Sequence, residues 1–286
     1  MTEFGKERRS VVPAQAGTHV LWQEAGPPPS RGPLALALRP ALALLKYLPL
    51  LLLALVWEAV VQLGLVSRDL LPSLSDVLKA GWQLLREGDF WANGAASLYR
   101  GAAGLALAVV VGAALGVAMA WWRAVDAFAG PLVEALYPLP KSALIPITVL
   151  WLGFGDGSKI LLIFLGCMIP VTVAAYNGAR SCEQALVWSA RSLGASRLRV
   201  LWDVVVPSAL PELLNGIRTA LALTFVLLVS SELIVARRGL GYLIGFLGEG
   251  GVYDAMFAVV LVVAFMGFFA DRLYQLLVRR VLAWRE

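Results

Sequence analysis

Two glycine-rich segments contain residue types that bind nucleotide phosphates, but neither has the required spacing. Residues 153–159 read Gly-Phe-Gly-Asp-Gly-Ser-Lys, which departs from the G-x-x-x-x-G-K-[ST] order and follows no buried strand. Residues 239–245 likewise miss the spacing of a dinucleotide fingerprint. No set of nucleophile, base and acid accompanies them. The sequence therefore predicts a chain that is not an enzyme, and any uphill work must draw its energy from a partner or an ion gradient.

The sequence offers no metal site and predicts no cofactor in this chain. Its single histidine, His19, lies near the N-terminus. Cys167 falls in an apolar segment and Cys182 in a polar one, so we expect no disulfide between them.

The composition is that of a multi-pass membrane protein. Of 286 residues, 59% are hydrophobic and only 15% charged, against about 25% charged in soluble domains. Residues 101–122 and 160–179 carry no charge, and each is close to the length of about 20 residues that a membrane span needs. The net charge of +5 does not indicate nucleic-acid binding, because the basic residues are spread along the borders of apolar segments.

The predicted fold is all-α, with four regions, of which residues 41–66 are the first transmembrane helix. Residues 1–40, which contain Pro27-Pro28-Pro29, are predicted to be a disordered cytoplasmic tail; a start codon assigned too far upstream is an equal alternative. Residues 67–96 are predicted to be a periplasmic connector, in which 76–85 can form a surface helix. Residues 97–286 form the main transmembrane domain. The six predicted spans are residues 41–66, 101–122, 132–152, 160–176, 213–236 and 256–281.

The third span contains Pro138, Pro140 and Pro146, so we expect that helix to be broken or bent. The placement of lysine and arginine sets the orientation. If both chain ends are placed in the cytoplasm, more lysines and arginines lie on the cytoplasmic side of the membrane than on the opposite side. The sequence therefore predicts a protein of the bacterial inner membrane with cytoplasmic N- and C-termini.

Charged residues inside predicted spans are costly, about 2.5–3.5 kcal/mol at the centre of a span. Glu232 is expected to face the interior, where it either pairs structurally or lines a pathway; Glu58 is expected to be interfacial or paired. Lys141 and Arg218 can offer positive potential to an anion, or extend to a membrane border. The Gly112/Gly116 pair predicts close helix packing within the chain or, alternatively, a dimer contact.

A polar, amphipathic segment interrupts the apolar pattern at residues 188–207. Gly194 can provide a turn, and Pro207 suits the first turn of the following helix. Leucines at 193, 198 and 201 are predicted to form an apolar face, and arginines at 191, 197 and 199 a basic one. We interpret the segment as a contact site for another protein; the alternative is a loop held to anionic lipid by its arginines.

This segment resembles the EAA loop of binding-protein-dependent ABC importer permeases. Ala190, Gly194, Val204, Val206 and Pro207 occupy the family positions, whereas Trp188 and Ser189 depart from them. The resemblance covers residues 70–286. Further motifs, namely Arg191-Ser-Leu-Gly-Ala195-Ser, Tyr137-Pro-Leu-Pro, Gly153-Phe-Gly and Gly239-Leu-Gly-Tyr-Leu-Ile, are similar to the nitrate, sulfonate and taurine branch.

The resemblance implies a type I importer permease with the MetI-like fold and a coupling loop at residues 180–211. It also implies two ATP-binding cassette subunits that carry the ATP, a periplasmic solute-binding protein and a second permease copy, making a homodimer in the lipid bilayer. The implied solute is a small oxyanion such as an alkanesulfonate, taurine or nitrate. An ion-coupled secondary transporter and a non-transporting membrane scaffold are the alternatives. The residues implied to contact the ATPase are Ala190, Arg191, Leu193, Gly194, Ala195, Arg197, Arg199, Val204, Val206 and Pro207.

Overall fold

The structure, a computed structural model, describes residues 47–68 and 70–283. The predicted tail at residues 1–40 and His19 lie outside these ranges. The chain divides after Leu53 into two units, and the arrangement below is that of the unit from Ala54 onwards. All regular elements in the described ranges are helices: α3 (Leu48–Gln62), α4 (Leu74–Leu84), α5 (Gly88–Trp121), α6 (Arg123–Leu136), the 3₁₀ helix η1 (Lys141–Leu144), α7 (Ile145–Leu152), α8 (Asp156–Arg180), α9 (Gln184–Ser192), α10 (Arg197–Val200), the π-helical turn η2 (Leu201–Val205), α11 (Val206–Val235), α12 (Leu240–Glu249) and α13 (Tyr253–Val281).

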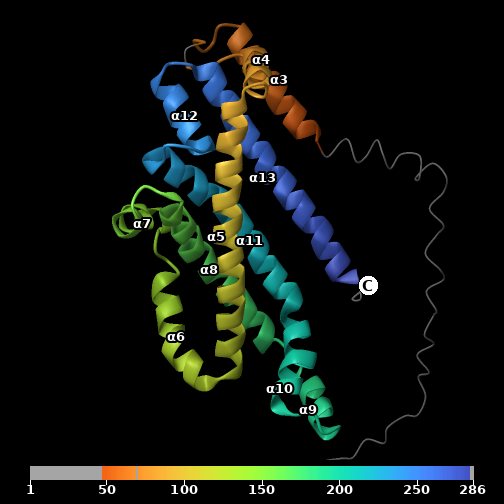
Figure 1. Cartoon of the computed structure of the whole chain (residues 1–286). Helices are drawn as coiled ribbons and strands as arrows, with labels where there is room; N and C mark the ends of the chain where they lie inside the picture. The colour runs from red at the N-terminus through yellow and green to blue at the C-terminus, as the bar shows by residue number, and fades with distance from the viewer. Residues whose placement is uncertain (1–46, 69, 284–286) are drawn as a thin grey trace, which may run out of the picture. The chain divides into compact units, whose positions relative to one another are not determined.

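Helix α8 is the centre of this unit, with α5 and α11 packed against it (Figure 1). Leu162, Ile163 and Cys167 of α8 are fully buried against Ala108 of α5 and Ala220 of α11. In its most apolar stretch α8 is 61% buried, whereas the corresponding stretch of α13 is only 17% buried. Helix α8 is therefore shielded by protein, and α13 keeps most of its surface exposed.

Gly112 and Gly116 let α5 approach α8 closely. A Cβ atom on Gly112 would lie 2.8 Å from the carbonyl oxygen of Met168, closer than real Cβ atoms approach. A Cβ on Gly116 would be closer still to the carbonyl oxygen of Thr172. Small residues of this kind allow membrane helices to pack backbone against backbone. The predicted packing of this glycine pair within the chain is confirmed.

The third predicted span is broken, as its prolines predict. Helix α6 ends at Leu136, and the stretch Lys141–Leu152 leaves it at an angle of 100°. Pro138 and Pro140 occupy the break, where each lacks a donor and disfavours helical geometry in the residue before it. Pro146 lies in the first turn of α7, where its missing N–H is not needed.

Four helical stretches of the described chain are long and apolar enough to cross a membrane, and the bent α6–α7 pair makes up to five. The four are α5, α8, Arg197–Val235 and α13. Helix α3 overlaps the first predicted span but has only 15 residues, short of the usual figure of about 20; residues 41–46 are not described. The count of six spans stays a prediction. The predicted boundary between residues 96 and 97 falls inside α5.

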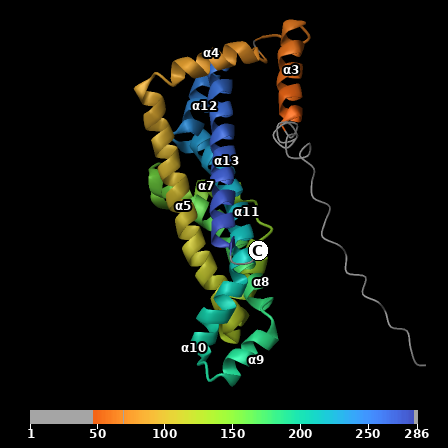
Figure 2. The same ribbon diagram turned by 90° about the vertical axis from the view of Figure 1, so that its right-hand side faces the viewer.

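The connector and the polar interruption lie at opposite ends of the unit that starts at Ala54. Helices α4 and α12 lie at one end and α9 and α10 at the other (Figures 1 and 2). The surface helix predicted at residues 76–85 is present as α4, and Ser73 caps it by accepting a hydrogen bond from the Asp76 N–H at 3.1 Å. The predicted topology requires this separation, because it assigns the two polar segments to opposite membrane faces.

We predict that Gly112→Leu destabilises the helix packing, because its side chain has no room against Met168 and Val171. Overpacking of this kind costs about 1–3 kcal/mol, occasionally more. Gly94→Leu is the matched control in the same helix, at a position where an added Cβ meets nothing within 4 Å. Thermal unfolding in detergent should show a lowered midpoint for Gly112→Leu alone. Equal midpoints for the two variants would contradict the close α5–α8 contact.

Candidate functional site

The polar interruption forms two short helices, α9 and α10, joined by a glycine turn. Gly194 has a φ angle of +85°, a conformation in which other L-residues are strained. Its N–H donates to the Arg191 carbonyl at 2.9 Å, and the Ala195 N–H donates to the Ala190 carbonyl at 3.1 Å. These two bonds make the Schellman pattern that ends many helices. The turn predicted at Gly194 is present.

The outer surface of this segment is both apolar and basic. Trp188, Leu193 and Leu198 expose 65%, 86% and 60% of their surface. Trp202 is also exposed. The arginines of the segment are exposed as well: Arg191, Arg197 and Arg199. Large apolar side chains gathered on an exposed surface indicate a surface that another molecule covers.

Leu201 does not share the apolar face predicted for it with Leu193 and Leu198. It is buried with Val200 and Val205 in a cluster that the ends of α5 and α8 complete. Leu193 precedes the glycine turn and Leu201 follows it, so one helical period does not connect them. The prediction of a single apolar face across the three leucines is wrong.

The second half of the segment is continuous with a membrane helix. Helices α10 and α11 and the turn between them form one helical stretch, Arg197–Val235. Pro207 has no N–H to donate, and the wider π-helical turn before it closes through the Val206 N–H and the Leu201 carbonyl. Val204 and Val206 pack against the buried cluster around Leu201. Helix α10 is therefore joined to α11 without an intervening loop.

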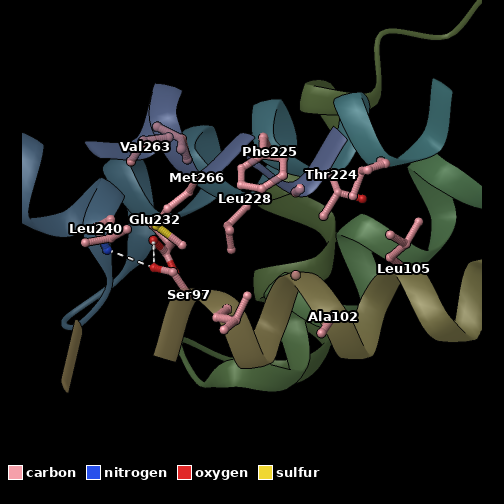
Figure 3. A pocket seen from close by; sticks show the side chains of 15 residues that line it. Ser97, Ala102, Leu105, Thr224, Phe225, Leu228, Glu232, Leu240, Val263 and Met266 are labelled. Atoms are coloured by element: carbon pink, nitrogen blue, oxygen red, sulfur yellow. Dashed lines mark hydrogen bonds between the residues drawn. The ribbon is translucent and has the colours of Figure 1, made fainter. Parts of the chain in front are cut away.

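Glu232 of α11 is fully buried and bound by several donors, of which Figure 3 shows Ser97. Its carboxylate accepts hydrogen bonds from Arg100 Nη1 at 2.6 Å and from the Gly241 N–H at 3.0 Å. The Ser97 hydroxyl donates to it at 2.7 Å and in turn accepts from the Leu240 N–H at 2.8 Å. The interior position predicted for Glu232 is confirmed. These partners offset the cost of burying its charge.

Arg100 extends this arrangement to a third helix. Its guanidinium also binds Asp156 of α8 at 2.7 Å and the Arg238 carbonyl at 2.7 Å. Beside it, the buried Lys159 donates to the carbonyl oxygens of Phe154 and Val235 at 2.6 and 3.0 Å. The cluster of Ser97, Arg100, Lys159 and Glu232, here called the buried ionic cluster, joins α5, α8, α11 and the start of α12, and Asp156 binds Arg100 at its exposed edge.

Sequence reasoning missed Ser97 and Arg100 as partners of Glu232. One signal was available, since Arg100 is the single basic residue of the 34-residue helix α5. A lone arginine within an apolar helix calls for a buried carboxylate, because otherwise its charge stays uncompensated. Which carboxylate it meets is set by the packing of α5 against α11.

The structure does not bring the three predicted pathway residues together. Lys141 lies at the break after α6, and its ammonium donates to the carbonyls of Leu136, Tyr137 and Leu139 at 2.7–2.9 Å. The negative end of α6 and the free carbonyls of the break explain this position. The other two residues have partners elsewhere: Arg218 pairs with Asp271 of α13 at 2.7 Å, and Glu232 lies in the buried ionic cluster.

An apolar cavity of about 180 Å³ lies next to Glu232, between α5, α11 and α13 (Figure 3). Its walls include Leu105, Phe225, Leu228 and Met266. The carboxylate at its edge already uses its oxygens within the buried ionic cluster. The cavity therefore offers neither positive charge nor free donors to an anion.

Within residues 47–68 and 70–283, no group of three or more histidine, cysteine or acidic side chains could hold a metal ion. Cys167 and Cys182 are both buried as free thiols. Cys167 donates to the Ala220 carbonyl and so contributes to helix packing.

Comparison with known proteins relates the chain to membrane transport subunits. The family model described as "Binding-protein-dependent transport system inner membrane component" matches residues 104–283. The taurine transport system permease protein TauC of Escherichia coli is 39% identical over 82% of this chain and 87% of its own length. The putative aliphatic sulfonates transport permease proteins SsuC of Escherichia coli and Bacillus subtilis are 33% and 31% identical, over 83% and 84% of this chain and 90% and 86% of theirs.

The fold is similar to that of a solved importer. A chain from an inward-facing structure of the MetNI methionine ABC transporter superposes with a TM-score of 0.53 at 20% identity. The match covers 73% of this chain and 98% of that one. A second crystal form of the same transporter gives a TM-score of 0.50. The predicted MetI-like, all-helical fold is confirmed.

We predict that Arg100→Met destabilises the protein strongly, because Glu232 would keep a buried charge without its cation. Breaking such a pair from one side costs about 3–5 kcal/mol. Lys79→Met, which breaks the exposed pair with Asp76, should leave the stability nearly unchanged, because water screens that pair. Thermal unfolding in detergent measures both. The double variant Arg100→Met/Glu232→Met should recover part of the loss, and no recovery would contradict the pairing.

Proposed function

Because the chain belongs to the family of binding-protein-dependent transport system inner membrane components, we propose that it carries small sulfonates, such as taurine or an alkanesulfonate, across the membrane. The chain is the membrane-spanning permease subunit of an ABC importer, and ATP hydrolysis takes place on separate subunits. The likeness to permeases named for taurine and aliphatic sulfonates supports the choice of solute. Nitrate, another small oxyanion, belongs to the same wider class of candidate solutes.

The coupling loop proposed at residues 180–211 docks on an ATP-binding subunit. Its exposed side chains Trp188, Leu193 and Leu198 would enter a groove of the ATPase, while Arg191, Arg197 and Arg199 would meet its acidic groups. Ala190, Gly194 and Ala195 fix the turn that presents them. The continuous stretch Arg197–Val235 supports this proposal most, because it joins the second part of the loop to a membrane helix without a break, as a lever would require. Val204, Val206 and Pro207 form its junction with α11.

The importer is proposed to contain two ATP-binding subunits, a second copy of this permease and a periplasmic solute-binding protein. The family is named for its dependence on a binding protein. With the coupling loop at one end of the unit, the end that carries α4 and α12 is available to the binding protein (Figures 1 and 2). ATP is the only cofactor that we expect, and we assign it to the partner subunits.

The membrane is proposed to be the bacterial inner membrane, with the chain's two ends in the cytoplasm. The long apolar helices support the assignment to a membrane. The arginines of α9 and α10 support a cytoplasmic loop, because basic residues favour that side.

Among the three pathway candidates, we propose Lys141 as the one that meets the anionic solute. Its ammonium lies at a helix break and is partly exposed. Breaks in membrane helices frequently line substrate sites. We assign Arg218 a secondary role, because Asp271 already compensates its charge. We assign Glu232 a structural role.

The alternatives receive no support from the comparisons. An ion-coupled secondary transporter would need intramembrane carboxylates that are free to take up an ion, whereas Glu232 is held by Arg100. A scaffold that does not transport would not explain the likeness to permeases over more than four fifths of the chain.

We predict ATP-dependent uptake of taurine or ethanesulfonate when the chain is reconstituted in liposomes with its ATPase subunits and binding protein. Uptake should stop when the ATPase subunits are left out, even under a proton or sodium gradient. Competition with nitrate, sulfate and methionine would define the solute class. Gradient-driven uptake by this chain alone would refute the proposed function.

We predict that Gly194→Pro and Gly194→Val lower coupled uptake by at least about tenfold, because neither residue suits a φ angle of +85°. An added Cβ meets nothing within 4 Å at Gly194, so strain in the backbone is the cause. Gly194→Asn is the matched control, since asparagine tolerates this conformation. Membrane insertion should be unchanged in all three variants. Normal uptake with Gly194→Pro would contradict the proposal that this loop transmits the movement of the ATPase to α11.

A further inference from the structure

A second cavity, of about 350 Å³, lies beside α9 at the end that carries the coupling loop. Three arginines from three elements line it: Arg123 at the start of α6, Arg180 at the end of α8 and Arg191 in α9. Asp126 is the single acidic residue among its lining residues. The cavity therefore combines room for a small head group with an excess of positive charge.

Most of this positive charge has no partner within the described ranges. Neither Arg123 nor Arg191 makes a side-chain hydrogen bond or ion pair there. Arg180 uses one nitrogen to bind the Tyr176 hydroxyl at 2.7 Å and lies 3.9 Å from Asp126. A guanidinium has five N–H donors, so Arg180 retains donors for a ligand. The charge of Asp126 is shared with Arg180 and with the Tyr176 hydroxyl, which donates to it at 3.2 Å.

The start of α6 borders the cavity. Its N-cap residue, Trp122, makes no side-chain capping bond to the 14-residue helix. The first backbone N–H groups of a helix lack partners within it and favour an anion in front of them. Arg123 is the first residue of this helix and Asp126 lies in its first turn, and both line the cavity.

We propose that this cavity, here called the basal arginine pocket, binds a tetrahedral oxyanion of the phosphate or sulfate type. A bound oxyanion would link Arg191 of the coupling loop to Arg123 and Arg180 of the membrane helices, and the five N–H donors of Arg191 allow it to contact the ATPase as well. It would thereby hold α9 against the rest of the unit. Two sources have this chemistry: the head group of an acidic phospholipid at the membrane border, and a free oxyanion from the cytoplasm. The binding itself does not depend on the proposed transport function; the effect on the coupling loop does.

Binding can be measured on the purified full-length chain without any partner subunit. Sulfate is titrated into the chain in lipid-free detergent at constant ionic strength, with chloride as the balancing salt. Its binding is measured by thermal unfolding and by calorimetry. Phosphatidylglycerol is tested in parallel by native mass spectrometry, against phosphatidylcholine. Saturable sulfate binding identifies the free oxyanion as a ligand, and selective retention of phosphatidylglycerol identifies the lipid head group.

The variant Arg123→Gln/Arg180→Gln should lower the affinity for the bound probe by at least about tenfold, because charge-assisted hydrogen bonds are lost. Arg280→Gln removes a basic residue that lies outside the pocket at the end of α13 and should leave the affinity unchanged. Asp126→Asn should raise it about threefold, because it removes the opposing charge; misfolding would not produce such a gain.

An equal loss of affinity with Arg280→Gln would contradict the proposed pocket. So would an affinity for both probes that does not depend on Arg123 and Arg180. Uptake assays in liposomes stay separate from these binding assays. A failed transport function would leave oxyanion binding intact, and a failed pocket would leave ATP-driven uptake intact.

Discussion

The contact between Arg100 and Glu232 is the interaction on which the packing of the membrane helices depends. Glu232 has no exposed surface, and Arg100 holds it at 2.6 Å while also binding Asp156. Charges of this kind are too costly to leave unpaired in an apolar interior, so α5, α8 and α11 must meet in one register. The Gly241 N–H, which donates to the same carboxylate, ties the start of α12 to that register.

Helix α11 connects the Arg100–Glu232 contact with the coupling loop. It carries Glu232 near one end and continues through the π-helical turn into α10 at the other. Between Glu232 and the coupling loop, α11 packs against α8 through apolar and small side chains, and α8 packs against α5 in the same way. A force on the loop would therefore rotate or tilt α11 about a region that the buried ionic cluster holds together. The lever proposed for the ABC importer needs such a stiff element, because a flexible joint would absorb the movement of the ATPase.

The two polar regions differ in how they manage charge. In the buried ionic cluster each charge meets a fixed partner, and the neighbouring cavity is apolar. At the coupling loop, arginines and large apolar side chains are exposed, and the arginines of the basal arginine pocket outnumber its one acid. The first region stabilises the permease by itself. The second is suited to partners that supply what it lacks, namely apolar cover and negative charge.

Features that depend on neighbouring residues in the chain could be predicted from the sequence. The broken third span follows from prolines at 138 and 140, and the turn at Gly194 follows from the conformational freedom of glycine. The family resemblance rested on local motifs of the same kind. Leu201 was assigned to the wrong face because helical periodicity does not continue across a turn. Only the tertiary structure decided that Arg100 meets Glu232, since these residues are 132 positions apart and their contact depends on how whole helices pack.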